Sequence, residues 1–561
     1  MKFSQMTYIR PEYEQTNEKL KTLLQAFKEA SSAQECFAAY KEIDDYMRYV
    51  FSMFSLAFIR NSLDMNDEYY ANEKEYLDET EPKLTGAAQE IKTALIESPF
   101  RKELEAAWGT LMFDKTEMAL KTFKPEIIPD LQEENRLATE YDKLIASAQI
   151  DFDGKTLTLA QLTPYHENPD RTVREASMRA RAEWLMSQSE QLDSLFDDLV
   201  KIRTHIAEKL GFENFIQLGY YRMQRLSYDR DMVAKFREGV VSHIVPITQR
   251  LKAGQAERIG VETIKIYDDP FEYPDGNAKP IGTTEDIFAH GRKMYHELSA
   301  DTKEFIDFML ENELFDVLTR PGKMSGGYCT EIDEYEAPFI FANFNGTSGD
   351  IDVLTHEAGH AFAYYVARDV YPSDLRDCSY ETAEVHSMSM EFFTWPWMEG
   401  FFGEKTGKYR FSHLSGALNF IPYGTMVDEF QHHIYQNPDM TPKDRNDLWL
   451  ELENKYRPYL DQEGFPFFGD GRRWQAQGHI YVRPFYYIDY CLAVTMALAF
   501  WAEDQKDHAQ AWAKYRRFVG LAGTRTFTDL VSDADLSSPF TPDTLKTVAD
   551  AAVKWLETTN D

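Results

Sequence analysis

The chain has 561 residues, of which 43% are hydrophobic and 27% charged, and its 94 acidic and 60 basic side chains give a formal net charge of -34. This composition is ordinary for a globular protein in water, but the length exceeds that of a single hydrophobic core, so we expect two or more lobes. A surface this acidic repels DNA, RNA and anionic lipids, so we do not expect nucleic acids or membranes as partners.

The cysteines and the start of the chain bear on the cellular compartment. The four cysteines are far apart and form no CxxC pair, so they do not make a disulfide framework. Reduced thiols predict a cytoplasmic location. The first residues lead directly into polar sequence, without the apolar segment of a signal peptide.

The first part of the chain is predicted to be helical. Residues from about Pro11 to Leu144 have the periodicity of long helices with charged outer faces. Alternating residues from Ile150 to Leu159 then flank the pair Asp153-Gly154, a pattern that predicts a β-hairpin. Helical patterns resume near Asp170.

The middle and the end of the chain contain three further distinct stretches. Prolines and glycines crowd residues 267–282, which predicts a connecting loop. The apolar run Ala337–Phe344 predicts a strand of a small sheet, and as an edge strand it could pair with an extended peptide. The most apolar stretch, Tyr490–Trp501, is too short to span a bilayer and predicts a buried core helix.

The most informative motif is His356-Glu357-Ala-Gly-His360, in a predicted helix. Imidazoles four residues apart project from one face of a helix and can together hold Zn²⁺. Glu357 points to one side, where it can act as a base on water at the metal without binding the metal itself. The longer pattern HExxHxxGxxH is excluded, because Ala363 and Val366 stand where that pattern needs glycine and histidine.

The third metal ligand must therefore come from another part of the chain. Residues 380–393 predict a second helix, which carries Glu381, Glu384 and Glu391. A glutamate from this helix would complete a site of two histidines and one carboxylate, but spacing alone does not separate Glu384 from Glu381. Glu391 lies two turns beyond Glu384 on the same face, where it could hydrogen-bond a ligand imidazole.

A segment near the C-terminal end is rich in polar aromatic side chains. It contains one histidine and four tyrosines, His479, Tyr481, Tyr486, Tyr487 and Tyr490. Imidazole N–H and phenol O–H groups are suitable donors to a developing oxyanion. Any one of the tyrosines could equally be packing in the core, with an incidental polar tip.

Together these motifs resemble the oligoendopeptidase F branch of the thimet oligopeptidase family of zinc metallopeptidases. The resemblance covers roughly residues 200–530 and includes the glycine-rich stretch 322–327, residues 338–346 and the stretch Asp428–Tyr435. In that family the glutamate at the position of Glu384 is the third ligand, so the resemblance implies one zinc ion per chain held by two histidines and this residue.

The resemblance also implies which donors contact the substrate. The family places a histidine and a tyrosine at the oxyanion, and His479 matches the position of the histidine. The family register favours Tyr486 as the tyrosine, while Tyr481, Tyr487 and Tyr490 remain open.

The fold and the reaction expected from the resemblance are those of an oligopeptidase. We expect a mainly α-helical protein with two helical lobes around a deep substrate channel and a small β-sheet next to the HExxH helix. Residues 1–200 would form an N-terminal helical region and part of one lobe, and residues 201–561 the zinc-metallopeptidase region. The expected reaction is hydrolysis of internal bonds in short peptides. The sequence does not indicate an oligomeric state.

One alternative belongs to a different class of protein. The pairs Glu357/His360 and Glu429/His432 are both Glu-x-x-His, and two such pairs with further glutamates define a di-iron carboxylate bundle. This alternative leaves His356 without a role and does not use the strand and glycines just before the motif. Metal analysis separates the two hypotheses, since one predicts zinc and the other two irons.

Overall fold

The computed structural model describes residues 1–320, 322–324 and 326–558. The N-terminal part is helical, as predicted. Polar side chains start its long helices: Ser32 accepts a hydrogen bond from the Glu35 N–H, and Asp67 from the Tyr69 and Tyr70 N–H groups. The helices are α1 (Tyr13–Lys28), α2 (Ala33–Leu63), α3 (Glu68–Ile96), α4 (Arg101–Trp108), α5 (Leu111–Lys121) and α6 (Ile128–Ala146).

The predicted hairpin is present. Strands β1 (Ile150–Phe152) and β2 (Lys155–Leu157) pair antiparallel around a turn at Asp153-Gly154. The pairing ends at Leu157, two residues earlier than the sequence pattern suggested, because Thr158 caps the next helix through the Gln161 N–H.

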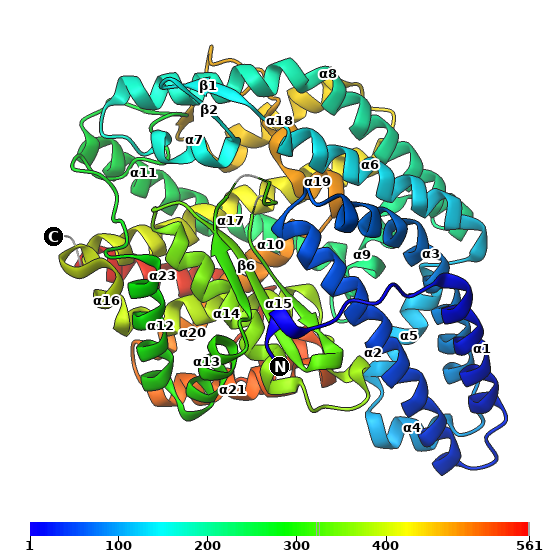
Figure 1. The fold of residues 1–561 in the computed structure, drawn as a ribbon. Coiled ribbons are helices and arrows are strands. Elements are labelled where there is room, and N and C mark those ends of the chain that lie inside the picture. The colour runs from blue at the N-terminus through cyan, green and yellow to red at the C-terminus, as the bar shows by residue number, and fades with distance from the viewer. Residues whose placement is uncertain (321, 325, 559–561) are drawn as a thin grey trace.

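Helices α7 and α8 lie in the upper part of the molecule in Figure 1. Helix α8 is 40 residues long and runs through residue 200. The division of the chain into residues 1–200 and 201–561 therefore stays a prediction. The predicted loop 267–282 contains no helix or strand. The elements of this part of the chain are α7 (Leu159–His166), α8 (Arg171–Leu210), α9 (Phe215–Arg222), α10 (Arg230–Gly239), α11 (Val245–Ile259) and β3 (Ile264–Lys265), which pairs with the later β7 (Leu460–Asp461).

The small sheet lies next to the HExxH helix, as expected. Its strands are β4 (Phe315–Leu318), β5 (Tyr328–Ile332) and β6 (Ala337–Phe344), in the order β4-β6-β5. The suggestion that Ala337–Phe344 is an edge strand is wrong, because β6 is the middle strand. Its unbroken apolar sequence fits that position, since nearly all of its side chains are buried. Within the described residues, β5 pairs with β6 alone and lies at an edge of this sheet.

Most of the remaining helices lie around the sheet in the lower half of Figure 1, whereas α18 and α19 lie in the upper part of the molecule. The apolar stretch Tyr490–Trp501 is the centre of α20, which is packed between α15, α17, α21 and α23. The helices are α12 (Thr284–Leu298), α13 (Ala300–Glu311), α14 (Gly349–Ala367), α15 (Tyr380–Phe393), α16 (Glu399–Phe402), α17 (Thr406–Gln436), α18 (Pro442–Tyr456), α19 (Gly478–Val482), α20 (Tyr487–Asp504), α21 (His508–Leu521), α22 (Phe527–Asp533) and α23 (Pro542–Thr558).

The expected fold class, mainly α with two helical lobes and a small sheet beside α14, is confirmed. A cavity of about 550 Å³ lies between the N-terminal helices and α9, lined among others by Lys92, Asn135, Arg222 and Val482. In the described part of the chain, we find no helix that is both long and apolar enough to cross a bilayer.

A buried ion-pair cluster joins the N-terminal helices to the rest of the molecule. The Glu134 carboxylate in α6 accepts hydrogen bonds from Arg203 in α8 at 2.7 Å and from Arg222 in α9 at 2.9 Å. Arg203 is 1% exposed and also donates to the Tyr481 carbonyl oxygen in α19. Burial alone would raise the pKa of Glu134, but the guanidinium groups of Arg222 and Arg203 lower it to about 2.

Glu134→Gln is expected to destabilise the protein at pH 7 by about 3–5 kcal/mol, because it leaves two guanidinium groups without their counter-charge. The wild-type contribution is present above the ordinary pKa of 4.5 and is lost as the pH falls toward about 2. The difference between variant and wild type should therefore shrink as the pH falls below about 4.5, measured by thermal unfolding at a series of pH values from pH 7 down to about pH 3. The exposed pair Glu133–Arg136 supplies the control: Glu133→Gln should cost less than about 1 kcal/mol. Equal losses in both variants would contradict the assignment.

Candidate metal centre

The two helices that carry the predicted ligands, α14 and α15, pack closely against each other. A Cβ atom at Gly359, inside the HExxH motif, would lie 2.5 Å from the Ser387 Cα and 2.7 Å from the His386 carbonyl oxygen. Only glycine therefore permits this separation of the helix backbones. The close approach brings the side chains of both helices to one point.

Three ligand atoms converge at this point. Glu384 Oε2 lies 3.3 Å from His356 Nε2 and 3.5 Å from His360 Nε2, and Glu384 is 2% exposed. Ligand atoms at 2.0–2.1 Å from a tetrahedral zinc ion would be about 3.3–3.4 Å apart, so the spacing fits such an ion. Among the described residues, these three side chains form the one detected group of three or more His, Cys, Asp or Glu that could hold a metal.

Glu381, the alternative that spacing left open, lies apart from the histidines. Its carboxylate accepts a hydrogen bond from Ser379 at 2.7 Å, and its charge interacts with Arg225 and Tyr228. It is as buried as Glu384, at 1% exposure. The structure thus brings Glu384, and not Glu381, to the two histidines.

A second carboxylate orients the first histidine. Glu391 Oε1 lies 2.7 Å from His356 Nδ1, so the other ring nitrogen of His356 faces the centre of the three ligands. Glu391 Oε2 lies 2.8 Å from His413 Nε2 on α17. His413 was not anticipated from the sequence, because it lies outside every ligand pattern and reaches the site only through Glu391.

Glu357 lies beside the ligands and is 7% exposed. Burial raises the pKa of its carboxyl group, while the neighbouring His356 and His360 act in the opposite direction. A carboxylate with a raised pKa next to a metal is suited to accept a proton from water.

The side chain of His479 has a defined tautomer. The Gln477 amide accepts from Tyr423 O–H at 2.7 Å, which directs its NH₂ group toward His479 Nδ1 at 3.1 Å. Burial and the nearby Arg483 lower the pKa of His479 to about 4, so the ring is neutral at pH 7. With Nδ1 accepting, the N–H is on Nε2, which lies 3.4 Å from Tyr490 Oη.

The four tyrosines of this segment have different environments. Tyr486 O–H donates a hydrogen bond to Glu384 Oε1, and its ring lies 4.9 Å from that of Tyr490. Tyr481 instead points into the core and donates to the Leu192 carbonyl oxygen at 3.2 Å. Tyr487 packs among the rings of its neighbours, with no hydrogen bond to any of the three ligands. Tyr486 and Tyr490 are therefore the two that face the ligand group.

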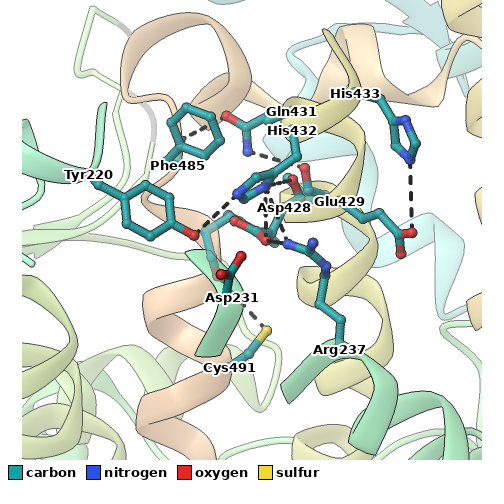
Figure 2. Close-up of polar contacts among 12 residues, drawn as sticks. Tyr220, Asp231, Arg237, Asp428, Glu429, Gln431, His432, His433, Phe485 and Cys491 are labelled. Atoms are coloured by element: carbon teal, nitrogen blue, oxygen red, sulfur yellow. Dashed lines mark hydrogen bonds and ion pairs between the residues drawn. The ribbon is translucent and has the colours of Figure 1, made fainter. Parts of the chain in front are cut away.

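The residues of the alternative di-iron site point to separate partners (Figure 2). Glu429 accepts from Lys455 at 2.8 Å and from Tyr456, and lies 3.9 Å from His433. His432 lies within hydrogen-bonding distance of Tyr220 and of the Asp428 carbonyl oxygen. Neither side chain belongs to the metal-binding group found among the described residues.

The comparisons with known proteins agree with this geometry. The sequence model described as peptidase family M3 matches residues 165–549, and that of the peptidase M3 N-terminal domain matches residues 3–123. The chain is 25% identical over 322 residues to the group B oligopeptidase PepB of Streptococcus agalactiae serotype III (strain NEM316). This match covers 54% of the chain and only 50% of that relative's length.

Solved structures with similar folds cover nearly the whole chain. A structure assigned provisionally as an oligoendopeptidase F is 49% identical, with a TM-score of 0.98, over 100% of this chain and 99% of the other. PZ peptidase A in complex with an inhibitor is 47% identical, with a TM-score of 0.97, over 99% of both chains. A Bacillus anthracis (strain Ames) protein, also assigned provisionally as an oligoendopeptidase F, is 44% identical, with a TM-score of 0.93, over 100% of this chain and 98% of the other.

Glu384→Ala is expected to remove bound metal, because it deletes one of three converging ligands. Glu381→Ala is a matched control, since Glu381 is equally buried, on the same helix and directed elsewhere. Plasma emission analysis after dialysis should find close to one ion per chain in wild type and Glu381→Ala, and almost none in Glu384→Ala. Metal retained in Glu384→Ala and lost in Glu381→Ala would reverse the assignment.

Proposed function

The chain belongs to peptidase family M3, and we propose that it is a zinc-dependent endopeptidase that hydrolyses internal bonds of short peptides. The observation that supports this function best is the convergence of His356, His360 and Glu384 beside a buried glutamate, Glu357. The identity of about 47% with PZ peptidase A over almost the full length supports the same reaction class. One zinc ion per chain is proposed, held by these three ligands.

The residues around the metal have distinct parts in the proposed reaction. Bound Zn²⁺ would supply a Lewis acid that polarises the scissile carbonyl and acidifies water. Glu357 accepts the proton of the attacking water and delivers it to the leaving amine. Its burial favours the protonated form, so the carboxyl group can hold the proton between the two steps. Glu391 keeps His356 oriented throughout.

We assign His479 and Tyr486 as donors to the oxyanion. Burial and the adjacent Glu384 raise the pKa of Tyr486, so its phenol stays protonated. The phenol donates to Glu384 Oε1 in this structure, and we propose that it turns from Glu384 to the oxyanion when substrate is bound. His479 is neutral and carries its proton on Nε2, directed toward Tyr490 at 3.4 Å. Tyr490 is the alternative phenol donor, because its ring lies next to that of Tyr486.

Short peptides are the proposed substrates. None of the residues that line the cavity of about 550 Å³ is a metal ligand, so this proposal is supported by the family and not by the cavity. Since β6 is central, we propose that an extended peptide pairs instead with β5, which is a terminal strand of the sheet. The relative from Streptococcus agalactiae, an oligopeptidase by name, supports the same substrate class.

The location, partners and division of the chain remain proposals. The four cysteines are free, which supports a cytoplasmic location. The charge of -34 argues against nucleic acids and anionic membranes as partners. We propose that residues 1–200 contribute mainly to one lobe and that residues 201–561 form the catalytic region.

Glu357→Gln tests the proposed mechanism most directly. The substitution keeps the shape of the side chain but cannot accept a proton, so zinc and peptide should bind as in wild type. Turnover should fall by more than about 10²–10⁴-fold, the usual contribution of one acid–base group, because Glu357 acts in two steps. Cleavage of a fluorogenic peptide by zinc-loaded protein measures the loss. Wild-type turnover in the variant would refute the role of Glu357.

Tyr486→Phe tests the oxyanion donor. Removing one donor that acts mainly in the transition state should lower kcat by about 10²–10³-fold with little change in KM. Tyr481→Phe is the control, because the Tyr481 hydroxyl bonds to the Leu192 carbonyl oxygen in the core. If Tyr486→Phe is as fast as wild type, Tyr486 is not the donor to the oxyanion, and Tyr490→Phe is the next variant to test.

A further inference from the structure

The residue before Tyr486 has an unusual backbone conformation. Phe485 has a φ of +68°, in the left-handed region that side chains other than glycine and asparagine seldom adopt. Such conformations persist only where surrounding contacts impose them, and they are frequent at functional sites. Phe485 sets the direction in which the chain enters α20, and hence where the neighbouring Tyr486 side chain points.

Two side chains from distant elements hold both backbone polar groups of Phe485. The Phe485 N–H donates to Gln431 Oε1 on α17 at 2.9 Å, as Figure 2 shows. The Phe485 carbonyl oxygen accepts from Arg225 Nη2 at 2.5 Å, and the same nitrogen donates to Asp489 in the first turn of α20 at 2.7 Å. Arg225 therefore ties the strained residue to the helix that follows it.

The orientation of the Gln431 amide follows from its second hydrogen bond. Gln431 Nε2 donates to the Val427 carbonyl oxygen at 3.1 Å, which leaves Oε1 as the atom that faces the Phe485 N–H. Gln431 is 1% exposed, so water does not readily replace either bond. An apolar side chain at this position would leave a buried N–H without a partner.

The Phe485 ring is confined as well as its backbone. The ring is fully buried and lies 5.0 Å from His432, 5.5 Å from Tyr435 and 5.8 Å from Tyr220, measured between ring centroids. A Cβ atom at position 219 would lie 2.5 Å from this ring, so Gly219 provides the space for it. Both the ring and the backbone of Phe485 are thus fixed by residues that do not touch the metal site.

We infer that Gln431 and Arg225 are positioning residues for Tyr486, which act by holding Phe485 in its left-handed conformation. The Asp428–His433 stretch, which the proposed reaction does not otherwise use, gains a role in this way: Gln431 bonds the Phe485 backbone, and His432 packs on its ring. The inference rests on the proposed function of Tyr486 as a donor to the oxyanion.

Gln431→Leu tests the inference in the full-length, zinc-loaded protein. The leucine keeps the approximate volume but removes the acceptor, so Phe485 should relax and displace the Tyr486 phenol. A displacement of the order of 1 Å can cost up to about 10²-fold in rate, and we expect kcat to fall on that scale with KM and zinc content unchanged. In a Tyr486→Phe background, Gln431→Leu should lower kcat by less than about twofold, because the group that it positions is already absent.

Gln255→Leu is the matched control. Gln255 is 2% exposed; its Nε2 donates to the Phe271 carbonyl oxygen at 2.8 Å, and its Oε1 accepts from Lys252 Nζ at 2.8 Å, so its replacement also removes a buried acceptor. If Gln431→Leu acted only by destabilising the protein, Gln255→Leu would lower kcat to a similar extent. We expect Gln255→Leu to keep the kcat of wild type. If Gln431→Leu does not fold, Gln431→Asn withdraws the acceptor by one methylene group and permits the same double-variant comparison.

The outcomes separate this inference from the proposed function. If Tyr486→Phe is slow and Gln431→Leu is as fast as wild type, the positioning role is refuted while the role of Tyr486 stands. An equal loss from Gln431→Leu in both backgrounds also refutes it, because Gln431 would then act through another group. If Tyr486→Phe is itself as fast as wild type, the proposed role of Tyr486 fails and the inference fails with it.

Discussion

A single buried carboxylate, that of Glu384, is the interaction on which the rest of the site depends. An ionised group at 2% exposure is stable only if other groups compensate its lost hydration. Both histidines, the Ser387 hydroxyl at 3.1 Å and the Tyr486 phenol surround it. Burial alone would raise the pKa of Glu384, but His360 and His356 lower it well below its ordinary value. The same anionic, nitrogen-rich environment is suited to a divalent cation.

The scaffold makes this arrangement possible through close helix packing. Gly359 lets α14 and α15 approach so that side chains from both reach one point. Helix α20 packs against α15 and carries Tyr490, while Tyr486 directly precedes its first turn. The ligands thus lie on α14 and α15, and α15 also contacts α20, next to which Tyr486 lies; His479 is on the short helix α19. Packed helices give a more precise support than mobile loops would provide.

Buried polar clusters farther from the metal hold this arrangement in place. The Arg225–Asp489 pair is fully buried and anchors the start of α20 to the backbone of Phe485. Arg203 similarly joins α6, through Glu134, to the α19 segment. Such pairs contribute little net stability by themselves, but breaking one leaves a buried charge unpaired. They therefore specify one arrangement of the helices more than they strengthen it.

Local sequence patterns determined the elements and most of the candidate ligands. Residues four apart lie on one face of any α-helix, so the pairing of His356 with His360 could be predicted from the sequence. The predicted helix 380–393, which carries Glu384, has the same bounds as α15. The choice between Glu384 and Glu381 needed the family resemblance, because both lie on one short helix and differ only in direction. The strand Ala337–Phe344 was evident from its apolar run, but its central place in the sheet was not.

Only the tertiary structure decided which distant groups meet. His413 reaches the site through Glu391, Tyr423 on α17 orients the Gln477 amide beside His479, and Gln431 and Arg225 hold Phe485. The spacing of residues along the chain does not show these contacts, because each of them joins separate elements. Periodicity reports the neighbours of a residue within its own element, whereas these contacts depend on how separate elements are packed.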